Sequence, residues 1–207
     1  MLSITDYGIV DTMSSSSSKT RILDCALSLI VRRGGADVTM AAIAKAARVS
    51  RQAVYLHFAD RADLLVALVR HLDEKRGIPE EIRKIEQAPS GLDAVRMMVS
   101  LQARLNPTLW APARAVEAVR RRDPAAERSW QDRLRNRLNG CRVIVDRMAK
   151  EGTLKPGLSP TVAADLLWTL TSLRTWEDLV QERGWAAAEY EKRMTELVLD
   201  ALAGKKK

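Results

Sequence analysis

Apolar residues recur every three or four positions along most of the chain, a spacing that places them on one face of an α-helix. Runs in which apolar and polar residues alternate, as in a half-buried strand, are missing, and the helix-forming residues Ala, Leu, Arg and Glu dominate. The pattern therefore predicts an all-α protein.

The first predicted helix begins near Ser18, a suitable N-cap residue, and ends before the glycine pair at 34–35. Its apolar positions are Ile22, Ala26, Leu29 and Ile30. Residues 1–18 end in a run of five serines, which cannot bury apolar surface, so we expect a disordered N-terminal arm there.

Two short helices follow, separated by about three residues. Thr39 is the N-cap candidate of the first, and Ser50 is the N-cap candidate of the second, which ends at Phe58. The apolar seam between them is expected to consist of Ile43, Ala44, Ala47, Val49, Val54 and Phe58. A helix, a short turn and a helix of these proportions predict a helix-turn-helix motif.

Further helices are predicted along the rest of the chain. One begins at Asp60 and ends at Gly77. One helix is predicted to follow Gly91, and the Asn106-Pro107 pair is expected to end it. A separate helix then leads to the arginine run at 120–122. The last predicted helices span 124–152, 160–182 and 186–203.

These boundaries predict the organisation of the chain. A helix-turn-helix domain occupies 19–66, and a larger helical domain occupies 67–203. The disordered arm at 1–18 precedes them, and a basic tail at 204–207 follows them.

The net charge of the chain indicates which kind of partner it binds. The net charge is +8 and the pI is about 9.8, a balance that favours a polyanion. Between residues 45 and 61, Asp60 is the only acid. The cations of this segment are Lys45, Arg48, Arg51 and Arg61.

Signs of other chemistry are few. Cys25 and Cys141 lie inside apolar helical patterns and are expected to be buried free thiols. No apolar run reaches the length of a membrane span, and the N-terminus lacks the basic start of a secretory signal, so we expect a soluble cytoplasmic protein. Paired His and Glu spacings, phosphate-binding loops and nucleophile elbows are also missing, so we expect no metal, no cofactor and no enzymatic activity.

The second short helix carries polar side chains on one face. On a helical wheel, Arg51, Gln52 and Tyr55 lie opposite Val54 and Phe58. Arg and Gln side chains suit the edges of guanine and adenine in the DNA major groove, and Tyr55 can contact a thymine methyl group or a phosphate. The pattern predicts that this helix reads DNA.

Residues around this face complete the candidate DNA-contact set. His57 and Arg61, near the end of the helix and the start of the next, are expected to meet the sugar-phosphate backbone. The full set is Thr39, Lys45, Arg48, Ser50, Arg51, Gln52, Tyr55, His57 and Arg61. Taken alone, an ordinary helical hairpin with a solvated polar face is an alternative interpretation.

Residues 19–72 resemble the DNA-binding domain of the tetracycline-repressor (TetR) family of bacterial transcription regulators. The stretches that carry the resemblance are "RILDCALSLIVRRGG", "VTMAAIAKAARVS" and "AVYLHFADRADLL". A weaker likeness to the last two helices of many members covers "LKPGLSPTVAADLLWTLTSLRTWEDLVQERGWAAAEYEKRM". The chain departs from the family at Arg48, where Gly is usual, at Leu56, often aromatic, and at Arg61, usually Lys.

The resemblance implies a homodimer that binds a palindromic double-stranded DNA operator, usually as a repressor, and is released by a small-molecule effector. It implies that residues 67–203 bind the effector and form the dimer. The candidate pocket residues are Met97, Met98, Trp110, Trp130, Met148 and Trp168, which are equally typical of an ordinary helical core. The candidate dimer-interface residues are Leu166, Leu170, Leu173, Trp176, Met194, Leu197 and Val198.

Two other classes of protein stay open from the sequence. One is an interaction protein that has kept the family fold and lost DNA binding. The other is a helical-bundle enzyme, whose site would have to come from scattered Asp, Glu, Arg and Ser residues without a recognisable pattern.

Overall fold

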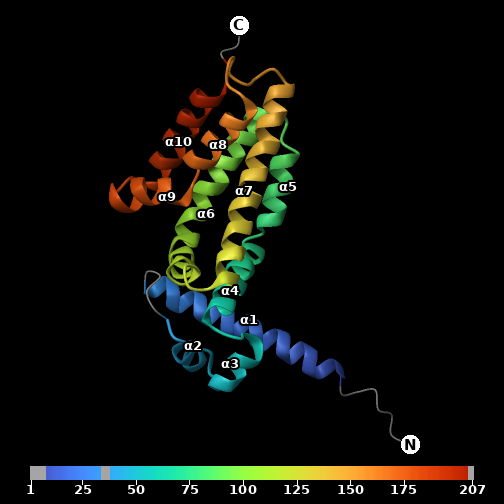
Figure 1. The fold of residues 1–207 in the computed structure, drawn as a ribbon, viewed down its shortest axis with the longest axis vertical. Helices are drawn as coiled ribbons and strands as arrows, with labels where there is room; N and C mark the ends of the chain where they lie inside the picture. Colours follow the sequence, from blue (N-terminus) through green and yellow to red (C-terminus); the bar gives the residue numbers. More distant parts are fainter. Residues whose placement is uncertain (1–7, 34–37, 205–207) are drawn as a thin grey trace, which may run out of the picture. The chain divides into compact units, whose positions relative to one another are not determined.

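The computed structural model describes residues 8–33 and 38–204, and in these ranges every regular element is helical (Figure 1). The predicted all-α fold is confirmed. The glycine pair, the first residues of the predicted arm and the lysines of the predicted tail lie outside the described residues.

The chain divides into two compact units. The first unit consists of Met1–Lys75 with Ala111–Ser129, and the second consists of Arg76–Trp110 with Trp130–Lys207. The division follows the end of α4 (Arg61–Lys75), so the predicted domain boundary between residues 66 and 67 falls inside a helix. Two long helices, α6 and α7, contribute residues to both units.

Three helices precede α4 in the first unit, and the last two have the predicted boundaries. They are α1 (Gly8–Arg32), α2 (Met40–Ala47) and α3 (Arg51–His57). Their core, with that of α4, contains Ile22, Ala26, Ile30, Ile43, Ala44, Ala47, Val54, Phe58, Leu64, Leu65, Leu68 and Leu72. Val49, expected in the seam between α2 and α3, is only half-buried.

The start of α1 differs from the prediction. The helix begins at Gly8 and continues through the serine tract, so the structure places residues 8–18, predicted as part of a disordered arm, in a helix. Serine is a moderate helix former, and residues 9–18 contain neither Gly nor Pro. Extending an existing helix costs much less than nucleating one, because each further residue adds a hydrogen bond.

Polar contacts connect α1 to α4. Asp24 Oδ1 accepts a hydrogen bond from Lys75 Nζ at 2.8 Å and lies 2.9 Å from His71 Nε2. Hydrogen bonds from Lys75 and His71 hold the pKa of Asp24 below its ordinary value. The carboxylate therefore favours the packing of α4 on α1 while it is ionised.

The second unit is built from the remaining helices. They are α5 (Ile78–Glu86), α6 (Gly91–Arg120), α7 (Pro124–Lys150), α8 (Pro160–Leu170), α9 (Leu173–Trp176), the π-helical segment η1 (Glu177–Glu182) and α10 (Ala187–Leu202). One apolar core joins them, and α8 packs against α10. The thiol of Cys141 is buried in this core as predicted, and burial raises its pKa to about 11. Cys25, in the first unit, is only half-buried, so its predicted burial is wrong.

Two helices that contain proline differ from the prediction. Pro79 is the second residue of α5, a helix that the apolar pattern did not reveal, and proline is well tolerated in this first turn. Pro107 lies inside α6, which is continuous although a break was expected at Asn106-Pro107. Buried neighbours, including Leu105 and Asn106, hold the helix together across the missing hydrogen bond.

The predicted helix 160–182 is divided in the structure. α8 ends at Leu170, and Ser172 begins α9 because its Oγ accepts a hydrogen bond from the Thr175 amide at 3.0 Å. The buried Thr171 hydroxyl donates to the Leu167 carbonyl at 2.7 Å. Serine and threonine compete with the backbone for these bonds, which favours a new helix start within an apolar run.

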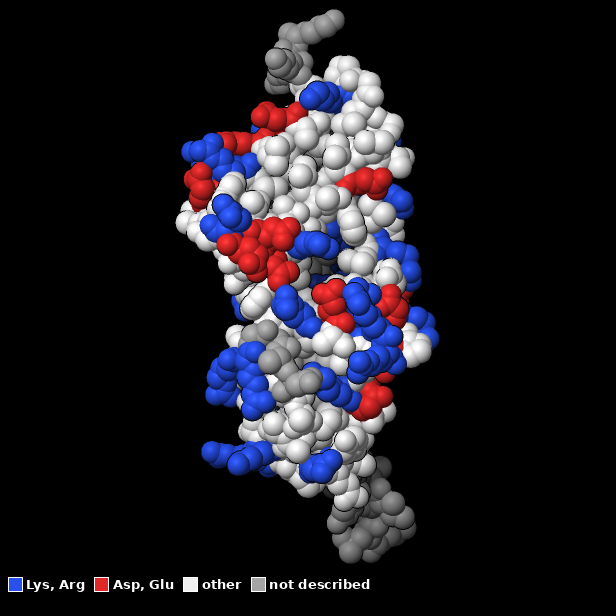
Figure 2. Space-filling model, turned by 60° about the vertical axis from the view of Figure 1, so that its left-hand side comes forward, with Lys and Arg blue, Asp and Glu red and all other residues white. Residues whose placement is uncertain are grey.

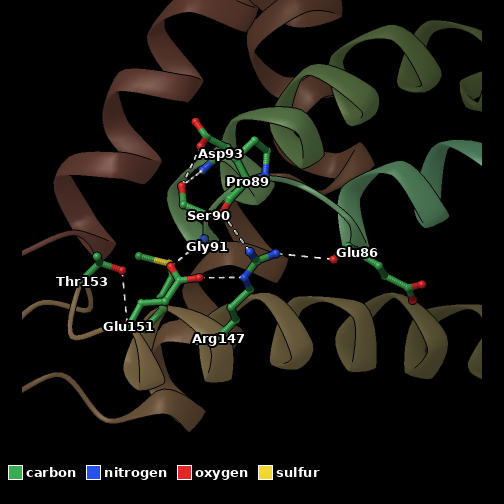
Figure 3. Close-up of polar contacts among 9 residues, drawn as sticks. Glu86, Pro89, Ser90, Gly91, Asp93, Arg147, Glu151 and Thr153 are labelled. Carbon is green, nitrogen blue, oxygen red and sulfur yellow. Dashed lines mark hydrogen bonds and ion pairs between the residues drawn. The ribbon is translucent and has the colours of Figure 1, made fainter.

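A polar clamp fastens the start of α6 to the end of α7 (Figure 3). Glu151 accepts a hydrogen bond from the Gly91 amide at 2.7 Å and another from Arg147 Nε at 2.7 Å. Arg147 Nη2 donates to the Pro89 carbonyl at 3.0 Å. The bond from Gly91 and then the contact with Arg147 lower the pKa of Glu151, so the clamp needs the ionised carboxylate.

Candidate nucleic-acid interface

The caps of α2 and α3 fix where the two short helices begin. Thr39 Oγ accepts a hydrogen bond from the Ala42 amide at 3.2 Å, and Ser50 Oγ accepts one from the Ala53 amide at 3.0 Å. Both hydroxyls satisfy amides that have no partner inside the helix. The two residues that were predicted as N-caps are therefore N-caps, and Ser50 lies at the start of the exposed α3 face.

The turn between these helices contains a backbone conformation that is rare for a side chain other than Gly. Arg48 has φ 54° and ψ 45°, in the left-handed region. The Val49 amide donates to the Ala44 carbonyl at 3.0 Å, which closes α2 in the manner of a glycine-terminated helix. An Arg in this conformation costs about 1 kcal/mol relative to Gly. The turn keeps its geometry, and its Arg adds a positive charge there.

α3 is apolar on one side and polar on the other. Val54 is 0% exposed and Phe58 is 1% exposed, whereas Tyr55 is 45% exposed. Arg51 and Gln52 are also exposed. The sole Phe thus anchors the segment from behind, and the structure brings the predicted Arg, Gln and Tyr together on the open face.

Positive charge surrounds this face. Lys45, Arg48 and Arg51 are exposed, and Arg61, the first residue of α4, is half-buried. At the level of α2 and α3 in Figure 2 the charged side chains are mainly Lys and Arg, on a surface of otherwise uncharged residues. Such a surface attracts the phosphates of a nucleic acid.

The start of α4 is held by a pair of acids. Asp60 Oδ1 accepts a hydrogen bond from the Asp63 amide at 2.9 Å, and Asp63 Oδ2 accepts one from the Ala59 amide at 3.0 Å. This reciprocal arrangement resembles a capping box, and it fixes Arg61 between the two acids at the end of the exposed face. His57 is half-buried, and its ring lies 6.2 Å from that of Phe58.

Two residues of this surface were not among the predicted site residues. Leu56 is 80% exposed on α3, beside Tyr55. Lys19 of α1 lies over the Phe58 ring, with Nζ 5.7 Å from its centroid. Leu56 could have been found from its place between Tyr55 and His57, but the Lys19 contact joins helices distant in sequence and left no sequence signal.

The candidate pocket residues fall mostly within the core of the second unit. Met98 and Met148 are buried there, and Met97, Trp110 and Trp168 pack against the same cluster. Trp130 does not belong to this cluster. Trp110 Nε1 donates to Glu177 Oε1 at 2.9 Å.

The candidate dimer-interface residues divide by exposure. Leu166 and Leu197 are 36% and 48% exposed, and Leu170 and Leu173 are half-buried. Trp176, Met194 and Val198 are buried inside the single chain. On α10 the buried stripe repeats every four residues from Tyr190, so Met194 and Val198 face the core, while Leu197 lies outside it.

Neither a membrane span nor a metal site is present among the described residues. No helix there is long and apolar enough to cross a membrane. No cluster of three or more His, Cys, Asp or Glu side chains there could hold a metal ion.

These features define a class of protein: a helix-turn-helix unit with an exposed basic and polar face, followed by a helical bundle. Residues 22–68 match the sequence profile described as "Bacterial regulatory proteins, tetR family". This segment belongs to the tetR family, and the resemblance seen in the sequence is confirmed.

Solved structures extend the likeness to nearly the whole chain. A regulator from Saccharomonospora viridis in complex with choline has a TM-score of 0.79 at 19% identity, over 92% of this chain and 100% of that one. A TetR-family regulator from Mesorhizobium loti has a TM-score of 0.69 at 22% identity, over 91% and 98%. NalD, a repressor of an efflux pump in Pseudomonas aeruginosa, has a TM-score of 0.67 at 21% identity, over 94% and 100%.

At these identities the likeness establishes a shared fold. No curated protein matches the chain. The chain as a whole therefore has the fold of tetR-family transcription regulators.

Proposed function

We propose that the protein is a ligand-responsive transcription regulator that binds a palindromic DNA operator as a homodimer and acts as a repressor in the cytoplasm. The observation that carries the proposal is the open face of α3. Arg51, Gln52 and Tyr55 are exposed there, while Val54 and Phe58 are buried behind them. A helix held in this way can enter the major groove with its polar side chains toward the base edges.

The residues divide into two roles. Arg51 and Gln52 read guanine and adenine edges, and Tyr55 contacts a thymine methyl group or a phosphate. The backbone contacts come from Thr39, Lys45, Arg48, Ser50, His57 and Arg61. The first role sets sequence preference, and the second contributes affinity that depends on salt.

A dimer explains how one short helix per chain achieves useful affinity, because one rigid body then binds two half-sites. Exposed apolar side chains on α8 and α10 favour this assembly. Val162 and Leu166 lie one turn apart on α8, and Leu197 lies on α10, which packs against α8. Pairing of these helices with those of a second copy would bury them in a symmetric four-helix contact.

The effector is expected to bind in the second unit. The similar regulator from Saccharomonospora viridis holds choline, and NalD is a repressor, which supports a ligand-responsive repressor here. The effector must prefer the conformation that releases DNA, since a ligand with equal affinity for both conformations changes nothing.

The proposal is tested by fluorescence anisotropy with random and selected duplexes at several salt concentrations. We expect log K to fall linearly with log salt, with a slope of about −0.9 per phosphate contact. Arg51→Ala should reduce the preference for the selected duplex. Arg61→Ala should weaken binding to both duplexes equally and reduce the slope by about 1.

A matched control is Arg142→Ala, which removes an exposed Arg from α7 in the second unit and should leave the slope unchanged. Binding that does not depend on salt, or no binding to any duplex, would refute the proposal. A change of sequence preference in Arg61→Ala would refute the assignment of roles.

A further inference from the structure

Arg137 of α7 lies in an unusual environment within the second unit. Its guanidinium stacks on Trp168, with Cζ 4.8 Å from the ring. Nη1 donates to Thr171 Oγ1 at 3.1 Å, and Nη2 donates to the Trp168 carbonyl. The cation is thus fixed against the end of α8.

In the part of the chain that the structure describes, this charge has no acidic partner. Among the described residues, no carboxylate forms an ion pair with Arg137, whereas Arg147 pairs with Glu151 and Arg193 pairs with Glu189. Burial lowers the pKa of Arg137, and Arg133 lowers it further. Arg137 is half-buried, and a cation that is partly withdrawn from water is usually paired, because losing water without a counter-charge is costly.

Two buried donors in the same unit lack acceptors. Asn106 is 1% exposed and its Nδ2 has no hydrogen-bond partner, and the buried Nε1 of Trp168 has none either. Buried N–H groups without an acceptor are rare in folded proteins. Each would gain from an acceptor supplied by a ligand.

Tyr190 connects these groups. Burial raises the pKa of Tyr190 to about 12, and the neighbouring Asn106 side chain and the charge of Arg137 both oppose this rise. Asn106, Arg137, Trp168 and Tyr190 therefore belong to one polar cluster, to which α6, α7, α8 and α10 each contribute one residue. The cluster has a positive charge and surplus donors, and the apolar core of the second unit adjoins it.

We propose that this cluster binds the carboxylate of a small organic acid with an apolar body, and that this acid is the effector. The proposal rests on the proposed function for the role of the ligand, and on the cluster alone for its chemistry. A carboxylate offers only acceptors, and its two oxygens match the fork of a guanidinium. A neutral amide of the same shape would add N–H donors to a site in which buried donors already lack acceptors.

The test compares octanoate with octanamide, and benzoate with benzamide, by titration calorimetry and thermal unfolding of the full chain without DNA. We expect saturable binding of at least one carboxylate and none, or much weaker binding, of its amide. Arg137→Gln should weaken carboxylate binding about 10- to 100-fold, the loss of one charge-assisted pair.

Two further variants keep the test independent of folding defects. Arg137→Lys keeps the charge without the fork and should bind the carboxylate with intermediate affinity. Arg142→Gln, an exposed Arg on the same helix, should bind it as the unmodified chain does.

Equal binding of acid and amide, unchanged affinity in Arg137→Gln, or no binding of either acid would overturn the proposal. Because binding is measured without DNA, the two hypotheses fail separately. If the chain binds DNA but neither acid, the regulator hypothesis stands and the carboxylate site is refuted. If the chain binds octanoate through Arg137 but binds no duplex, the carboxylate site stands and the regulator hypothesis is refuted.

Discussion

Gly91, the first residue of α6, is the described glycine at which an added Cβ would make the closest contact. A Cβ at Gly91 would lie 2.7 Å from Met148 Cγ and 3.0 Å from the Met148 amide nitrogen. Carbon atoms in favourable contact are about 3.5–4.0 Å apart. Met148 is 0% exposed, so its side chain cannot move aside into water.

Two opposing effects set the change in the free energy of unfolding that Gly91→Ala should cause. Overpacking of a core costs about 1–3 kcal/mol, and replacing Gly by Ala in a helix gains up to about 1 kcal/mol. The gain is small at the first helical residue, so Gly91→Ala should lower the free energy of unfolding by about 1–2 kcal/mol. For a chain of this size that lowers Tm by about 2–8 °C. Displacement of Glu151 from the Gly91 amide would add to the loss (Figure 3).

Gly140 is the matched control. It lies within α7, and a Cβ there would meet only Met98 Cε at 3.9 Å, an ordinary contact. Gly140→Ala should therefore raise the free energy of unfolding by about 0.5–1 kcal/mol. Urea unfolding followed by circular dichroism measures both, at one protein concentration because dimerisation shifts apparent stability. A neutral Gly91→Ala, or a Gly140→Ala that is the less stable of the two, would refute the packing argument.

Two other predictions concern the first unit. Arg48→Gly should raise the free energy of unfolding by about 1 kcal/mol and reduce the salt slope of DNA binding by about 1. Arg48→Asn should give the same loss of slope with less gain in stability, and an unchanged slope in both variants would place Arg48 away from DNA. Asp24→Asn should be less stable than the unmodified chain at neutral pH, because the lowered pKa of Asp24 makes its ionised form stabilising above about pH 4. The urea midpoints of the two chains should converge as the pH falls through that pKa, and a difference that persists at lower pH would contradict the role given to Asp24.

The helix-turn-helix could be predicted from the sequence because its signals are local. Thr39 and Ser50 each bond an amide three residues away, and the buried positions of α2 recur within a single short helix. The polar face of α3 followed from the same periodicity, since Val54 and Phe58 fix which side is turned inward. The strained turn between α2 and α3 could also be predicted, because Arg48 stands where the tetR family usually has Gly.

Longer helices were predicted less well because distant contacts override local signals. Pro107 costs α6 a hydrogen bond, yet the packing of its buried neighbours keeps the helix whole. Ser172 interrupts an apolar run that would otherwise continue as one helix. Trp176 and Met194 looked available for a partner chain, but the fold places both in its own core.

The candidate ligand site could not be predicted from the sequence at all. In the sequence, Arg137 is one Arg among several on α7, and nothing marks it as lacking a counter-charge. Only the tertiary structure sets it against Trp168 and near Tyr190.

The sequence by itself determined the helical class, the positions of the short helices and the face that they expose, because period, cap and turn chemistry act over a few residues. The tertiary structure alone decided which long helices stay intact, which apolar residues are covered, and which charge lacks a partner. Those outcomes depend on what each side chain meets from other helices, and that is set by the packing of the whole unit.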